Sequence, residues 1–119
     1  GMKDQAKAHI IQELIQHDFL NESRFVESFI RGKFNYKQWG KQKISYHLKQ
    51  KNIPQQLIDQ NMSVIDESDY QNTIRELIRK KVGNKKKVSL KDKQKVIRSL
   101  QTKGYEFGNI MDVWSQFYD

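Results

Sequence analysis

The sequence repeats itself. The segment Asn21–Phe25 (NESRF) returns at Asp66–Tyr70 (DESDY), 45 positions later, and Lys41–Ile44 (KQKI) returns at Lys93–Val96 (KQKV), 52 positions later. The second copy therefore carries about seven extra residues between its two signatures. A repeat of this period indicates a small helical unit stacked on a copy of itself, and such arrays build binding surfaces more often than active sites.

Composition limits what these units can bury and which chemistry they can perform. Of the 119 residues, 36% are apolar and 30% are charged, enough to pack small helical units but not one deep core around a large ligand. The chain has no cysteine, which excludes disulfides, zinc–thiolate sites and cysteine nucleophiles and fits a reducing cytoplasm. No apolar run approaches the roughly 20 residues of a membrane span.

Apolar residues recur with helical spacing, and only one proline is present. The spacing predicts helices over residues 3–17, 22–34 and 39–51, a fourth that begins at Pro54, and the same series again up to residue 117. We therefore predict an all-α fold of tandem three-helix repeats. The expected division is a leading helix in residues 1–20, a repeat over 21–65, and a second repeat over 66–119 with a basic loop insertion. By position, the leading helix is the third helix of a repeat whose first two helices are missing upstream.

Particular residues are expected to end these helices or to fill the core. Asn21, Ser89 and either Asp66 or Ser68 are the predicted helix N-caps, and Gly83 and Gly104 the predicted helix ends. Aromatic residues on the helical stripes are expected in the core: Phe25, Phe29, Tyr70, Trp114 and Phe117. Phe34, Tyr36 and Trp39 alternate with lysines, so they either pack the turn between helices or stack on bases. We favour packing, with Trp39 the most buried of the three.

Charge is distributed in blocks. The net charge is +8, no acid lies between Glu27 and Asp59, and Asp92 is the only acid between Glu76 and Glu106. This pattern predicts a basic face that attracts a polyanion or an acidic protein surface, although any single lysine here is more simply a solvated side chain. The candidate binding residues are Arg31, Lys33, Lys37, Lys41, Lys43, Lys85, Lys86, Lys87, Lys93 and Lys95.

Catalysis has no candidate in this sequence. There is no glycine-rich phosphate loop, no nucleophile paired with a base, and no pair of carboxylates beside a histidine. His9, Glu13 and His17 are spaced to share one helix face, but a solvated face is the favoured interpretation over a metal site. We expect a protein that is not an enzyme, with no cofactor, no metal and no small-molecule substrate.

Taken in order, the motifs resemble the RecX family of recombinase regulators. The resemblance rests on the acid-capped Arg24-Phe25 start, the basic stretch to Gly40, the pair Ile44-x-x-x-Leu48 and the short stop before Ile53, and it extends from about Ile10 to Trp114. It implies an elongated, curved array that lodges in the groove of the RecA–DNA filament and inhibits ATP hydrolysis and strand exchange, without catalytic activity of its own. Such a regulator acts in DNA repair, including the SOS response, in the bacterial cytoplasm.

This sequence departs from the pattern in its second repeat, and one other function fits the same residues. Lys91-Asp92 stands where the first repeat has Trp39-Gly40, and residues 83–88 are inserted. The alternative is a helix-turn-helix-like module that binds DNA directly, with the middle helix of either repeat as recognition helix. The basic residues are mostly lysines, which suit phosphate contact better than base recognition. Weak, non-specific DNA binding fits both interpretations.

Overall fold

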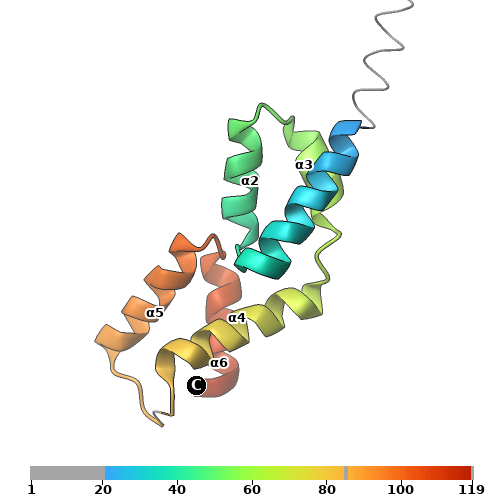
Figure 1. The fold of residues 1–119 in the computed structure, drawn as a ribbon. Helices are drawn as coiled ribbons and strands as arrows, with labels where there is room; N and C mark the ends of the chain where they lie inside the picture. The colour runs from blue at the N-terminus through green and yellow to red at the C-terminus, as the bar shows by residue number, and fades with distance from the viewer. Residues whose placement is uncertain (1–20, 85, 119) are drawn as a thin grey trace, which may run out of the picture.

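The computed structural model describes residues 21–84 and 86–118. In these residues it consists of helices joined by short turns and loops, with no strand (Figure 1). The all-α class predicted from the sequence is confirmed. The leading helix expected over residues 3–17 lies outside the described residues. The helices are residues 21–37, α2 (Lys41–Gln50), α3 (Gln55–Met62), α4 (Glu67–Val82), α5 (Leu90–Thr102) and α6 (Phe107–Tyr118).

The helices form two three-helix units, drawn one above the other in Figure 1. The helix over residues 21–37 packs with α2 and α3 in what we call the first repeat, and α4, α5 and α6 pack together in the second repeat. Residues 52 positions apart form the same backbone hydrogen bond after the middle helix of each repeat. The Ile53 N–H donates to the Leu48 carbonyl at 3.1 Å, and the Tyr105 N–H donates to the Leu100 carbonyl at 3.1 Å. All four side chains are buried, so the sequence repeat is also a structural repeat.

Side-chain caps and glycines fix most of the helix ends where the sequence predicts them. The Asp66 carboxylate accepts the Asp69 N–H at 3.2 Å, and the Ser89 hydroxyl accepts the Asp92 N–H at 3.1 Å. Gly83 ends α4 with a positive φ of 68°. Other predicted ends differ by up to three residues: the helix expected over 22–34 runs to residue 37, and the one expected over 39–51 begins at Lys41. Pro54 is the N-cap of α3 rather than part of its first turn, and Asn21 is already helical rather than a cap.

Several predictions about aromatic burial are wrong. Phe25 is 46% exposed and Phe117 is 45% exposed, although both were expected in the core. On the first helix the fully buried stripe is Val26, Ile30 and Phe34, spaced four residues apart, and this register leaves Phe25 at the edge. Phe34 is also more buried than Trp39, which is half-buried, and Tyr36 is 87% exposed and packs against nothing in the core.

The two repeats meet backbone to backbone at two glycines. The Gly40 N–H donates to the Lys103 carbonyl at 2.8 Å, and the Gln42 N–H donates to the Gly104 carbonyl at 2.9 Å. A Cβ on Gly40 would lie 2.3 Å from the Gly104 carbonyl carbon, so only glycine permits this approach. Gly104 also has a φ of 103°, a conformation that side chains disfavour.

Two buried tyrosines complete this junction between the repeats. The Tyr70 hydroxyl accepts the Lys41 N–H at 3.0 Å and donates to the Glu106 carboxylate at 2.8 Å, while the Tyr105 hydroxyl donates to the Gln38 carbonyl at 2.8 Å. Burial raises the pKa of both phenols well above the ordinary value, and the nearby Glu106 carboxylate adds to the effect. Both tyrosines therefore stay protonated and keep donating, which fixes one repeat on the other.

Candidate polyanion-binding surface

The junction gathers lysines from three helices that are far apart in the sequence. Lys43 comes from α2, Lys80 and Lys81 from the end of α4, and Lys103 from the residue after α5. Partial burial lowers the pKa of Lys103, and repulsion from Lys80, Lys81 and Lys43 lowers it further. We call these four residues the junction lysine cluster. An anion bound among these lysines would relieve their mutual repulsion, so the cluster is a candidate anion-binding site.

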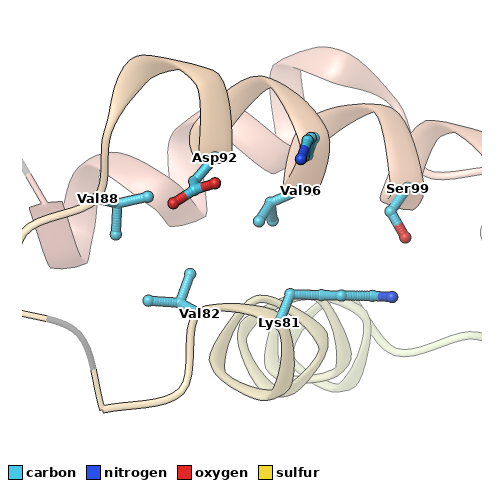
Figure 2. Close-up of a pocket in the computed structure, with 7 residues that line it drawn as sticks. Lys81, Val82, Val88, Asp92, Val96 and Ser99 are labelled. Carbon is cyan, nitrogen blue, oxygen red and sulfur yellow. The ribbon is translucent and has the colours of Figure 1, made fainter.

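A hollow of about 260 Å³ between α4 and α5 extends this basic surface (Figure 2). Val82 and Val88 form its apolar end, and the Lys81 side chain extends from the α4 side, next to Val82, toward the end where Ser99 lies. Lys95 also lines the hollow. The Asp92 carboxylate also lines the hollow, near Val88, so only the end with Lys81, Lys95 and Ser99 offers donors that suit a phosphate or carboxylate on a larger partner.

Aromatic side chains hold some of these lysines in place. The Lys33 and Lys43 ammonium nitrogens lie 4.8 Å and 4.7 Å from the centre of the Trp39 ring, and the His47 ring lies 4.5 Å from it, centre to centre. Trp39 is thus half-buried between these two lysines and the His47 ring. This favours the packing role for Trp39 and positions Lys43 at the junction.

The candidate residues from the sequence fall into separate groups. Lys33 and Lys43 lie around Trp39 and Lys95 lies in the hollow, whereas Lys86, Lys87 and Lys93 lie at the far end of the second repeat. Arg31 is paired with Glu27 at 2.8 Å and Lys41 with Glu67 at 3.3 Å, so their charges are partly neutralised. Lys37 is exposed, and Lys85 lies outside the described residues.

Sequence reasoning missed Lys80, Lys81 and Lys103. All three lie in the stretch with a single acid between Glu76 and Glu106, and that signal was available. Their meeting with Lys43 depends on how the second repeat docks on the first, which no local pattern reveals.

The part of the chain that the structure describes shows neither a metal-binding cluster nor a membrane-spanning helix. Among the described residues, no group of three or more His, Cys, Asp or Glu side chains could hold a metal ion. No helix in residues 21–84 or 86–118 is long and apolar enough to cross a membrane. What the surface provides is a set of ammonium donors on a rigid support.

Fold and surface together define a class of protein: an array of three-helix repeats with a basic surface. The model of the second three-helix domain of RecX matches residues 21–62, and the model of the third matches residues 67–114. The chain belongs to the RecX family of regulatory proteins, as its motifs suggested.

Curated relatives agree with this assignment. The chain is 31% identical to the regulatory protein RecX of Clostridium botulinum, covering 100% of this chain and 59% of that protein. It is 32% identical to regulatory protein RecX of Clostridium acetobutylicum (92% and 52%) and 31% identical to that of Escherichia coli strain SE11 (87% and 61%). The chain thus spans about half to three-fifths of these relatives. No solved structure gives a significant match.

Proposed function

We propose that this protein binds the RecA recombinase filament in its groove and inhibits ATP hydrolysis and strand exchange in the bacterial cytoplasm. Family membership supports a regulatory role, and the resemblance noted in the sequence supplies the partner. The observation that carries the proposal is the junction lysine cluster. Lys80, Lys81 and Lys43 lie near enough to Lys103 to repel its charge, and among the described residues none of the four forms an ion pair.

A nucleoprotein filament is a suitable partner for such a surface. Its DNA phosphates are polyanionic, and a protein groove adds carboxylates at fixed spacing. Ammonium groups that face these anions speed association and set the orientation of the bound protein. The junction keeps the two repeats in one relative position, so little conformational freedom is lost when both contact the filament.

DNA-dependent ATP hydrolysis by RecA tests the proposal. The protein is titrated into RecA on single-stranded DNA as wild type, as Lys103→Glu and as Lys49→Glu. Both substitutions change the charge equally, but Lys49 is outside the junction lysine cluster and lines a different hollow, which Asp59 and Glu106 also line. We expect Lys103→Glu to raise the half-inhibitory concentration about tenfold and Lys49→Glu to leave it nearly unchanged. Lys103→Glu should fold normally, because the new carboxylate lies among lysines.

Binding of the same proteins to that DNA without RecA is the control. Inhibition by wild type at concentrations where naked DNA is barely occupied supports the filament as target. Absence of inhibition even when the DNA is saturated contradicts the proposal, and so does equal loss in the two variants.

Direct DNA binding is the second candidate, and one observation favours it. The middle helix α5 presents an exposed stripe at helical spacing that is free of acids: Lys91, Gln94, Lys95 and Arg98. A stripe of this kind can lie along a DNA groove, with lysines on phosphates and the glutamine and arginine near bases. Affinity for naked duplex DNA that matches the affinity for the filament would favour this function over the first.

A further inference from the structure

A second basic region surrounds exposed aromatic residues at the far end of the second repeat. Trp114 of α6 is buried, whereas Phe117 in the next turn is 45% exposed, and the Tyr118 ring lies 6.1 Å from the Phe117 ring, centre to centre. Two hollows, of about 390 Å³ and 250 Å³, both have Phe117 and Tyr118 in their walls. Cations line both hollows and no described acidic residue lines either: Lys86, Lys87 and Lys93 in the larger, Arg75 and Arg79 in the smaller.

Arg75 places a positive charge directly on the exposed ring. Its guanidinium carbon lies 5.3 Å from the centre of the Phe117 ring. Its terminal nitrogens donate to the side-chain amides of Asn72 (3.2 Å) and Gln116 (2.7 Å), which are neutral, so these bonds orient the cation without cancelling its charge. The Nε of Arg75 is buried with no hydrogen-bond partner. An unpaired buried donor is costly, and a ligand that supplies an acceptor would relieve that cost.

A ligand for this region must satisfy a flat apolar ring and several cations at once. An acidic peptide satisfies the cations but does not cover the ring. Duplex DNA presents phosphates but keeps its bases inside the stack. A single strand offers both an exposed base that can stack on an aromatic ring and a phosphate on either side of it.

We propose that the end of the second repeat binds single-stranded nucleic acid, with one base stacked on Phe117 and the adjacent phosphates on the surrounding lysines and arginines. We call this region the α6 end site. It shares no residue with the junction lysine cluster. The proposal concerns naked strand and does not depend on the proposed RecA partner.

Fluorescence anisotropy with two labelled strands tests the proposal. One is an oligothymidylate of about 12 nucleotides, and the other is an abasic strand with the same number of phosphates. Phe117→Leu removes the stacking ring, and Phe25→Leu is its matched control, because Phe25 is equally exposed on the first repeat. We expect Phe117→Leu to weaken oligothymidylate binding about tenfold and to leave abasic binding unchanged. Phe25→Leu should change neither, and Phe117→Trp should retain the wild-type preference for the strand with bases.

Several results would overturn the proposal. Wild type that binds the abasic strand as tightly as oligothymidylate has no stacking site, and equal losses in the two leucine variants would place the effect elsewhere. If polyglutamate of matched charge displaces oligothymidylate as well as unlabelled oligothymidylate does, the site selects acidic polymers and not nucleic acid. Far-UV circular dichroism verifies that both variants remain folded, as expected for exposed side chains.

Discussion

Gly40→Ala tests whether the glycine junction holds the two repeats together. Gly40 has φ −77° and ψ 167°, which alanine adopts without strain, so any effect comes from the new Cβ alone. That carbon would meet only backbone: the Gly104 carbonyl carbon and oxygen at 2.3 Å and the Tyr105 nitrogen at 2.4 Å. These distances are about 1 Å too short for ordinary contact, and backbone atoms cannot rotate away as a side chain can.

The expected loss in the free energy of unfolding follows from the interactions that cross the junction. Besides the exposed Lys41–Glu67 ion pair, four hydrogen bonds cross it, from the amides of Gly40, Lys41 and Gln42 and from the Tyr105 hydroxyl. At about 1 kcal/mol net each, complete separation costs about 4 kcal/mol. Keeping the junction closed around an extra methyl costs about 1–3 kcal/mol. We expect the free energy of unfolding to fall by about 2–3 kcal/mol, and the melting temperature by roughly 10 °C for a chain of this size.

Urea unfolding measures this change, with far-UV circular dichroism for helix content and tryptophan fluorescence for each repeat. Trp39 reports on the first repeat and Trp114 on the second, and replacing one by Phe isolates the other. Gly32→Ala is the matched control, because a Cβ there meets nothing within 4 Å, and it should stabilise the helix by about 0.5–1 kcal/mol. If Gly40→Ala unfolds within 0.5 kcal/mol of wild type and the two reporters coincide, the reasoning about the junction is refuted.

Three further predictions concern the same network and one helix cap. Tyr70→Phe leaves the Lys41 N–H and the Glu106 carboxylate without the phenol, and should lower the free energy of unfolding by about 1–3 kcal/mol in urea. Because folding raises the pKa of Tyr70 and Tyr105, their contribution to stability is complete below about pH 10 and is lost as the pH rises further; phenolate absorbance from both should appear only as the helices melt. Ser89→Ala removes the α5 cap and should cost about 1 kcal/mol, measured by thermal melting.

Each of these has a control or an opposing result. Tyr46→Phe alters an exposed tyrosine and should be neutral, so equal losses in the two Phe variants would refute the role of Tyr70. Phenolate absorbance from all five tyrosines while the helices are intact would contradict the buried network. Ser89→Asp should preserve the cap, and its failure to do so would point to a different cause.

Local patterns predicted the elements of this fold well, because each depends on residues close in the sequence. The caps at Asp66 and Ser89 and the stop at Gly83 follow from side-chain and backbone preferences of single residues. Prediction failed where the rotation of a helix against its neighbours decides burial. Phe25 and Val26 are equally good core candidates by composition, yet one is half exposed and the other fully buried.

The sequence predicted that the candidate site would be a basic surface, but it did not predict which lysines would form the junction lysine cluster. Blocks of charge indicated a basic face, and they included Lys43 and Lys95. The meeting of Lys103 with Lys80 and Lys81 depends on the antiparallel packing of α4 and α5, and its meeting with Lys43 depends on two glycines 64 residues apart in the chain. The same reason hid Phe117, whose exposure leaves it beside Arg75 instead of in the core.

The glycine contact also gives the array a polarity. It needs a glycine at the position of Gly40 in one repeat and at the position of Gly104 in the next. The equivalent positions, 52 residues away, hold Asp92 in the second repeat and Asn52 in the first. A chain engineered with the repeats in swapped order would therefore present two side chains where the native order presents none. The repeats are related by sequence but are not interchangeable, because each has glycine at only one of the two contact positions and the native order brings those two glycines together.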